Sequence, residues 1–262
     1  MQKTEVFKHK MEKENKTPEE ELKELIPVIT KEEIKKESPR SDREAERRAE
    51  SLSKWKPKTK LGVAVREGKI KNIDEIFEQG IKIMETEIVD TLLNLQTDFL
   101  LIGQAKGKFG GGKRRIWRQT QKKTAEGNVP KFSCMAVVGD GNGHIGIGLG
   151  KSSETLPSRE KAVKQAKINM IRIKRGCGSF ECGCSENHSI PFMVEGKVGS
   201  SRIKLIPAPK GTGLAIEDEC KKLMKLAGVK DIYSRTFGQT RTKINLIRAC
   251  FDALRKTREI KK

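Results

Sequence analysis

Long apolar runs, aromatic side chains and histidine are all scarce in this chain of 262 residues. No apolar run approaches the roughly 20 residues that a membrane-spanning helix needs, so we expect no membrane partner. The first residues have no apolar stretch either, which argues against a secretory signal. Aromatic residues make up 5% of the chain, and only Phe109 and Trp117 lie in its most basic segment. Sequence-specific reading of single-stranded nucleic acid is therefore not expected, and recognition of shape and phosphates fits better.

Catalytic constellations are also missing from the sequence. His9 lies in the charged N-terminal part and His144 in a predicted hairpin, where a lone histidine is usually a surface or RNA-contacting residue. Neither paired carboxylates nor a Ser-His-Asp pattern can be recognised, so we predict that the chain is not an enzyme. Its six cysteines suit a reducing compartment better than a disulfide framework, which favours a cytoplasmic protein.

Acidic residues are deficient in one part of the chain only. The first 90 residues carry equal numbers of basic and acidic side chains, so the whole net charge of +20 arises after them. The densest stretch is residues 104–123, QAKGKFGGGKRRIWRQTQKK, with eight basic residues, four glycines and no acid. So much unpaired charge would repel itself in a closed fold, and its natural counterpart is the phosphate backbone of a nucleic acid.

Three glycine patterns resemble phosphate-binding loops. Residues 107–114, GKFGGGKR, place Arg114 where a nucleotide-binding loop needs serine or threonine, and no apolar helix follows. Residues 141–146 have the glycine spacing of a dinucleotide loop but precede a strand instead of a helix. We therefore predict no nucleotide cofactor. The third pattern, PAPKGTG at residues 207–213, precedes a helix, and its N–H groups around Lys210 either bind an RNA phosphate or belong to a purely structural turn.

Changes in composition divide the chain into five segments. In order they are a charged and mostly disordered extension, a preamble with short helices, a first domain, a Cys/His-rich linker and a second domain, at residues 1–53, 54–94, 95–175, 176–189 and 190–262. In the preamble, an N-cap at Asn72 and a stop at Gly80 predict one short helix.

The first domain is predicted to be α+β. Strand candidates lie at residues 98–105, 113–120, 131–140 and 144–151, and the last two are joined by Asp-Gly and Asn-Gly turn signals. Gly146, Gly148 and Gly150 fall on one face of the last strand, where a helix backbone can approach closely. That helix is expected to begin near Pro157 and to carry an apolar stripe as far as Ile173.

The second domain is predicted to be a small α/β layer. Strand candidates lie at residues 193–198, 201–209 and 230–237, and helix candidates at 216–227 and 241–257. Cys220 and Cys250 fall within the apolar stripes of these helices and are predicted core residues, as is Cys134 in the first domain.

Four metal-ligand side chains gather in the linker, RGCGSFECGCSENH. Cys177, Cys182, Cys184 and His188 would suffice for a tetrahedral zinc site, and the glycines would let the loop fold over the ion. The spacing C-x4-C-x-C-x3-H is not a common zinc knuckle. Two interpretations therefore stay open, a structural zinc site and reduced thiols in an ordered linker.

Several motifs resemble the universal small-subunit ribosomal protein S-five family. The first is VVGDGNGHIGIGLGK, followed by a helix with KAVKQAKINM. LIPAPKGTGLA, KLAGVKDIYSRTFGQTRTKIN and RACFDALRKT extend the resemblance, which covers residues 55–257. The preamble and the RGCGSFECGC linker resemble the archaeal form of the family. Residues 119–130 make the region between the first strands longer than the family pattern leads us to expect.

The resemblance implies both a fold and a function. The first domain would be similar to a double-stranded-RNA-binding domain, with antiparallel strands and one helix, and the second would be of the S-five C-terminal type. The chain would be a structural constituent of the small ribosomal subunit. It would bind small-subunit rRNA and neighbouring ribosomal proteins near the head–body hinge and the messenger entry channel, with messenger RNA nearby, and would support assembly and decoding accuracy.

The alternative function is a non-ribosomal, zinc-dependent regulator that binds duplex RNA. Under the ribosomal interpretation, residues 107–117 correspond to the family's basic hairpin, which points toward the hinge. We assign RNA contact to basic residues in both domains, namely Lys106, Lys108, Lys113, Arg114, Arg115, Arg118, Lys122, Lys123, Lys151, Arg159, Lys164, Arg202, Lys210, Arg235 and Arg241.

Overall fold

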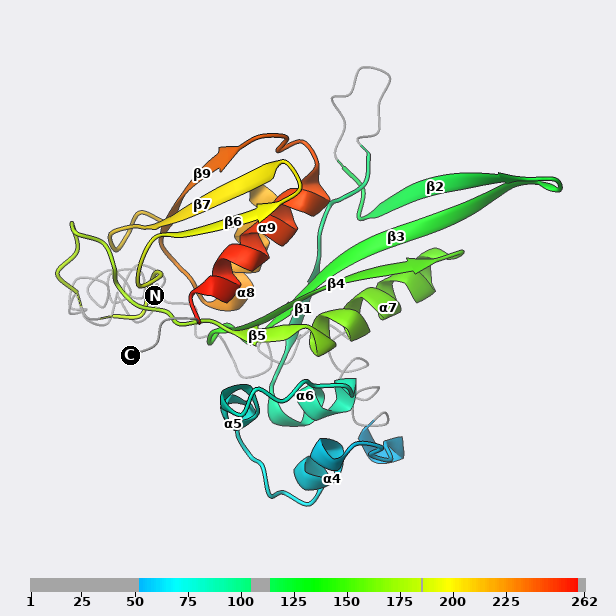
Figure 1. Cartoon of the computed structure of the whole chain (residues 1–262), viewed down its shortest axis with the longest axis horizontal. Coiled ribbons are helices and arrows are strands. Elements are labelled where there is room, and N and C mark those ends of the chain that lie inside the picture. The colour runs from blue at the N-terminus through cyan, green and yellow to red at the C-terminus, as the bar shows by residue number, and fades with distance from the viewer. Residues whose placement is uncertain (1–51, 105–113, 185, 259–262) are drawn as a thin grey trace, which may run out of the picture. The chain divides into compact units, whose positions relative to one another are not determined.

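The computed structural model describes residues 52–104, 114–184 and 186–258, which Figure 1 draws in colour. The prediction of a disordered extension falls on residues 1–51, outside the described residues, and so does the glycine-rich part of the basic segment, at residues 105–113. From Lys54 onward the chain forms one compact unit.

Three short helices form the preamble and share a small apolar core that includes Ile76 and Ile88. Their bounds are Lys60–Arg66 (α4), Ile73–Glu78 (α5) and Thr86–Leu92 (α6). The helix predicted between Asn72 and Gly80 is α5. Gly80 follows it with φ of +69°, a conformation that favours glycine, whereas the Asn72 side chain makes no capping hydrogen bond.

The first sheet is antiparallel, and one helix covers one of its faces (Figure 1). The elements are β1 (Gln96–Phe99), β2 (Trp117–Thr124), β3 (Gly127–Gly139), β4 (His144–Ser152), α7 (Thr155–Ile168) and β5 (Met170–Arg172). The strand order is β1-β3-β4-β5, and β2 pairs with the first part of β3. The antiparallel sheet with its single covering helix agrees with the predicted α+β fold.

Several predicted elements of the first domain have different bounds. β2 at Trp117–Thr124 lies later than the predicted 113–120, and β3 at Gly127–Gly139 begins before the predicted 131–140. The helix was expected to extend its stripe to Ile173, but α7 ends at Ile168, and Met170 begins strand β5. The free edge of β4 takes up residues 170–172 as a partner strand, whose ladder bonds replace those of a longer helix. The first strand is β1 at Gln96–Phe99, earlier and shorter than the predicted 98–105.

The glycine face of β4 lies directly against α7, as predicted. A Cβ atom built on Gly146, Gly148 or Gly150 would lie 2.1 Å from a backbone oxygen of that helix. Such a distance is far inside van der Waals contact, so no larger residue fits at these positions without a displacement of the helix. The alternation of glycine and apolar residues along β4 therefore sets how closely helix and sheet approach.

The second sheet has four strands in the order β6-β7-β9-β8, with β8 parallel to β9 and the other pairs antiparallel. The elements are β6 (Val194–Val198), β7 (Ser201–Pro207), β8 (Leu214–Ala215), α8 (Asp218–Ala227), β9 (Ile232–Phe237) and α9 (Lys243–Lys256). α9 packs on β6 and β7. The predicted strands and helices of this domain are all present, and the two-residue strand β8 is an addition. Cys134, Cys220 and Cys250 are buried, as predicted.

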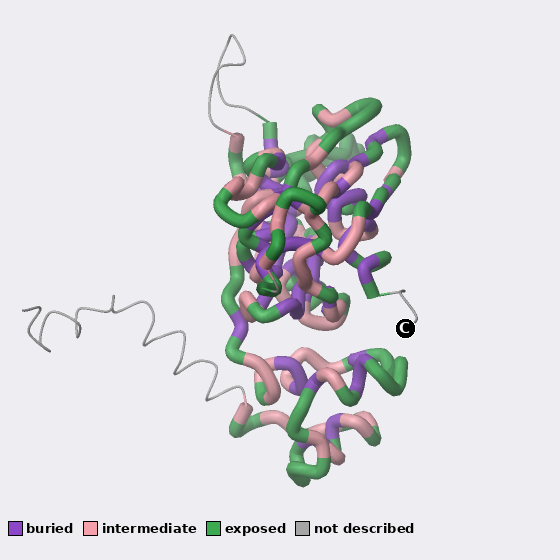
Figure 2. The backbone as a smooth tube through the Cα atoms, turned by 90° about the vertical axis from the view of Figure 1, so that its left-hand side faces the viewer, coloured by how far each residue is buried: buried purple, intermediate pink, exposed green. Residues whose placement is uncertain are grey.

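One apolar core joins the two sheets. The face of the first sheet opposite α7 contributes Met135, Val137, Ile145 and Ile147, which belong to the same buried cluster as the core of the second domain. Helix α8 packs on β3 and β4 and so lies at this junction. Figure 2 shows the buried residues gathered in the interior of the chain, with exposed residues along its loops.

Candidate nucleic-acid interface and metal centre

The hairpin formed by β2 and β3 extends beyond the rest of the first sheet (Figure 1). β3 pairs with β4 only from Phe132 onward, whereas its pairing with β2 continues to the turn at residues 124–127. All residues from Arg118 to Lys131 are exposed. The residues 119–130 that lengthen this region are thus the outer part of a two-stranded ribbon.

The strand register places four basic side chains on one face of this hairpin and its base. Arg118 lies opposite Ser133, Lys122 opposite Val129 and Lys131 opposite Thr120, so all three share a face. Ser133 also pairs with Lys151 of β4. We call Arg118, Lys122, Lys131 and Lys151 the basic sheet end. It lies on the face opposite α7, and the predicted RNA contacts did not include Lys131, which the alternation along β3 could have identified.

The opposite face of the hairpin base holds a cation–π pair. The Arg159 guanidinium of α7 lies 4.7 Å from the centre of the Trp117 ring and 5.5 Å from that of Phe99. The Trp117 ring therefore already has a guanidinium of the protein itself as a stacking partner. Arg159 is half-buried, and its role as an RNA contact stays a prediction.

The other predicted RNA contacts lie at several places. Arg202 lies on the outer face of the second sheet, because Ile203 and Leu205 of the same strand are buried in the core. Arg235 pairs with Lys204 and so shares the face of Arg202. Arg115, Lys123, Lys164, Lys210 and Arg241 are exposed, Arg114 is half-buried, and Lys106, Lys108 and Lys113 lie outside the described residues. Of the predicted contacts that fall within the described residues, the basic sheet end contains Arg118, Lys122 and Lys151.

The loop at residues 209–213, here called the Lys210 loop, binds a carboxylate side chain of the same protein through its backbone N–H groups. Asp231 Oδ1 accepts hydrogen bonds from the N–H groups of Gly211 and Gly213, at 3.1 and 2.8 Å. The expectation that these groups could bind an RNA phosphate is therefore wrong, because a buried carboxylate occupies the position. Only the exposed Lys210 side chain remains for an RNA contact, and its Nζ lies 2.7 Å from Glu186 Oε1.

The four predicted metal-ligand side chains meet in space. The ligand atoms of Cys177, Cys182, Cys184 and His188 all lie within 4.8 Å of one another. The Cys182 sulfur is 3.0 Å from the Cys184 sulfur and 3.7 Å from His188 Nε2. A bridge between Gly176 and Ser189 closes the segment into a loop. Three thiols and one imidazole at this separation match a closed tetrahedral site.

His188 has the environment of a metal-binding histidine. Its side chain is 3% exposed, and Nδ1 lies 2.9 Å from Asp231 Oδ2, although without the alignment of a regular hydrogen bond. An acidic partner at Nδ1 favours the proton on that nitrogen, which leaves the lone pair of Nε2 directed at the thiols. The carboxylate behind the imidazole is the usual outer partner of a histidine ligand, so the donor set fits zinc.

Contacts within the cluster also shift the pKa values of two of its thiols. The Cys184 thiol, together with the backbone N–H groups of Lys210 and Cys184, lowers the pKa of Cys182 to about 6. The same contact with Cys182 raises the pKa of Cys184 to about 11. The lowered pKa of Cys182 favours its thiolate, which is the form that binds metal.

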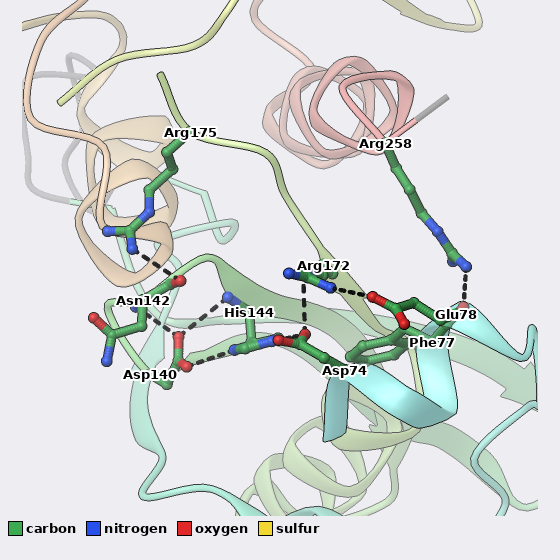
Figure 3. A network of polar contacts seen from close by, with 9 residues as sticks. All are labelled: Asp74, Phe77, Glu78, Asp140, Asn142, His144, Arg172, Arg175 and Arg258. Atoms are coloured by element: carbon green, nitrogen blue, oxygen red, sulfur yellow. Dashed lines mark hydrogen bonds and ion pairs between the residues drawn. The ribbon is translucent and has the colours of Figure 1, made fainter. Parts of the chain in front are cut away.

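A second polar cluster ties the preamble to the first domain (Figure 3). His144 Nδ1 lies 2.6 Å from Asp140 Oδ2, and its Nε2 lies 2.9 Å from Asp74 Oδ1. The ring stacks on Phe77 with the centroids 6.0 Å apart. Arg172 Nε lies 3.1 Å from the same oxygen, Asp74 Oδ1. His144 is therefore a buried structural residue, and its assignment to the surface or to an RNA contact is wrong.

Contacts within this cluster shift the pKa values of His144 and Asp140 in opposite directions. Burial alone would lower the pKa of His144, but its hydrogen bonds to Asp140 and Asp74 outweigh burial and raise that pKa. Burial opposes ionisation of Asp140 as well. The contact with His144 and the hydrogen bond from the backbone N–H of Asn142 nevertheless lower the pKa of Asp140. The cluster is thus favoured as an imidazolium between two carboxylates.

Comparisons with known proteins give the family of the chain. A model described as the ribosomal protein S5 N-terminal domain matches residues 116–174, and one described as the S5 C-terminal domain matches residues 196–262. The chain is 52% identical over 212 residues to the small ribosomal subunit protein uS5 of Nanoarchaeum equitans, with 80% of this chain and 91% of that protein covered. The chain belongs to the uS5 family.

Other uS5 proteins give the same result. The protein of Thermofilum pendens is 46% identical over 204 residues, covering 78% of this chain and 94% of its own length. That of Methanobrevibacter smithii is 41% identical over 212 residues, covering 80% and 92%. These archaeal uS5 relatives confirm the resemblance to the archaeal form.

Membership in the uS5 family settles several further predictions. It confirms the two-part α+β fold and the prediction that the chain is not an enzyme. The comparisons give no support to the regulator of duplex RNA. Within the described residues, no helix combines the length and the apolar character needed to span a bilayer.

Proposed function

We propose that this chain is a structural constituent of the small ribosomal subunit and binds small-subunit rRNA through its basic sheet end. The observation that carries the rRNA contact is the exposed face shared by Arg118, Lys122, Lys131 and Lys151. In the part of the chain that the structure describes, no carboxylate forms an ion pair with any of the four. Phosphates are the counterions that such a face binds.

The uS5 family supports the assembly of the chain with rRNA and neighbouring ribosomal proteins in the small subunit. The proposal includes the position implied by the motifs, near the head–body hinge and the messenger entry channel with messenger RNA nearby. It also includes support of assembly and of decoding accuracy. The predicted domain boundaries and the RNA contacts outside the basic sheet end belong to the same proposal.

The salt dependence of rRNA binding tests the role of the basic sheet end. Replacing Arg118, Lys122 and Lys151 together with alanine should weaken binding and lower the slope of log affinity against log salt by roughly 2–3, since each phosphate contact contributes about 0.9. A control with the same charge change replaces the exposed lysines Lys56 and Lys71 together with Arg66. An equal loss of slope in both variants would show that only net charge matters and would refute the site.

Zinc is the second part of the proposal, with a structural role and no open coordination position. It rests on the convergence of Cys177, Cys182, Cys184 and His188, and on the acidic partner behind the buried His188. The bound ion would hold the linker between the two domains closed. When all four protein ligands are engaged, no water remains on the ion to act as a nucleophile.

Metal analysis of the purified protein tests the zinc site. The expected result is one zinc per chain in the wild type and in Cys134→Ala, which removes a buried thiol outside the cluster. Cys182→Ser should lose the metal. Cobalt in place of zinc should give the thiolate-to-metal absorption of a tetrahedral sulfur-rich site. A wild-type protein purified under reducing conditions without stoichiometric metal would favour the reduced-thiol interpretation.

A further inference from the structure

Asp231 connects the metal centre to the Lys210 loop. The residue is 4% exposed, so both of its carboxylate oxygens need partners inside the protein. Oδ1 accepts the hydrogen bonds from Gly211 and Gly213, and Oδ2 lies 2.9 Å from His188 Nδ1. A single buried side chain therefore contacts a proposed metal ligand on one side and two loop N–H groups on the other.

The backbone fixes the position of His188 but not the orientation of its ring. The N–H groups of Lys230 and Asp231 both donate to the His188 carbonyl oxygen, at 2.8 and 3.2 Å. The two ring nitrogens face Asp231 Oδ2, 2.9 Å from Nδ1, and the Cys182 sulfur, 3.7 Å from Nε2. A metal ion on Nε2 would fix both the ring and the proton on Nδ1.

The Lys210 loop depends on Asp231 for its conformation. Gly211 and Gly213 have φ angles of +92° and +74°, a region that few side-chain-bearing residues adopt. Both of their N–H groups point to the same carboxylate oxygen, and the loop closes on itself through a Thr212 hydroxyl that donates to the Pro209 carbonyl at 2.8 Å. Without the carboxylate, two N–H groups would lose their shared acceptor.

We propose that the metal centre controls the conformation of the Lys210 loop through His188 and Asp231. This inference rests on the proposed zinc site. Because coupling between two sites is reciprocal, a change at Asp231 must also weaken metal binding. Removal of such an outer partner typically costs 10–100-fold in metal affinity, and we expect a loss of that order, about 10–100-fold, for Asp231→Asn.

Two variants separate the metal site from its connection to the loop. His188→Cys supplies a fourth thiolate and so retains a complete zinc ligand set, but it removes the imidazole that contacts Asp231. Asp231→Asn retains an oxygen that can accept from the loop but presents an amide N–H toward His188 Nδ1, where two donors would meet. Both variants keep the glycines and Lys210 unchanged.

Hydrogen exchange of the Gly211 and Gly213 amides in the full-length protein is the test. With zinc bound, both amides should be protected, and chelation by EDTA should speed their exchange about tenfold or more while the Gly148 amide of the first sheet stays slow. Zinc-loaded His188→Cys should exchange quickly at both glycines while retaining one zinc per chain. This comparison remains informative even if chelation loosens the whole domain.

The outcomes distinguish the two proposals. Bound zinc together with unchanged protection in His188→Cys would overturn the connection and leave the zinc site standing. A wild-type protein that binds no zinc overturns both. Fast exchange at the two glycines in zinc-loaded His188→Cys, with a slow Gly148 amide, supports the connection.

Discussion

Replacement of Gly148 with alanine should test the close packing of β4 against α7. A built Cβ atom would lie 2.1 Å from the Ala162 carbonyl oxygen and 2.3 Å from the Ala166 nitrogen. Both contacts are with backbone atoms, so no side chain can rotate away. Relief requires α7 to retreat by roughly 1 Å, which would weaken dispersion contacts along the whole helix–sheet interface.

Overpacking of this kind costs typically about 1–3 kcal/mol and more when backbone must move, whereas alanine recovers about 0.5–1 kcal/mol of the chain entropy that glycine loses. We therefore expect Gly148→Ala to lower the free energy of unfolding by about 1–2 kcal/mol. Urea unfolding of the full chain measures this loss. Lys151→Ala, at an exposed position of the same strand, is the control and should change the value by less than about 0.5 kcal/mol. Equal stability of the two variants would refute the close contact.

Three further predictions concern other parts of the fold. The folded state raises the pKa of His144, so the stabilising contribution of this residue is complete below about pH 6.5 and is lost as the pH rises through the folded-state value. His144→Gln should therefore flatten the fall of the urea midpoint above pH 6.5. An unchanged slope would mean that other groups cause that fall. Glu85 accepts a hydrogen bond from Trp55 Nε1 at 2.8 Å, so Glu85→Ala should expose Trp55 and red-shift its fluorescence, and an unshifted spectrum would contradict this. Gly196→Ala should destabilise the second domain about as much as Gly148→Ala does the first, as urea unfolding would show, because a built Cβ meets the Ala249 oxygen of α9 at 1.9 Å.

The features that the sequence predicts well are those encoded by neighbouring residues. The turn signals at residues 140–143 do join β3 and β4, and the glycines of β4 do allow the close approach of α7. The helices α8 and α9 lie where their apolar stripes placed them. In each case a periodic pattern within one segment carries the information.

The features that the sequence did not predict depend on distant partners. His144 looked like a surface residue because Asp74, 70 positions earlier, is not part of its local pattern. The anion of the Lys210 loop is supplied by Asp231, some 20 residues later. The short strand β5 exists because the edge of β4 offers backbone partners, not because its own residues alternate. Tertiary contacts decide such cases.

The core common to both sheets bears on the synthesis of the chain. β4 leaves the translating ribosome well before α8, which covers its apolar face together with that of β3. At typical rates of about 5–20 residues per second, that face stays open to solvent for several seconds. During this interval Met135, Val137 and Ile147 of the nascent first domain form an exposed apolar surface. The last third of the chain thus completes the first domain as well as the second, and a truncated product would be a target for chaperones and proteases.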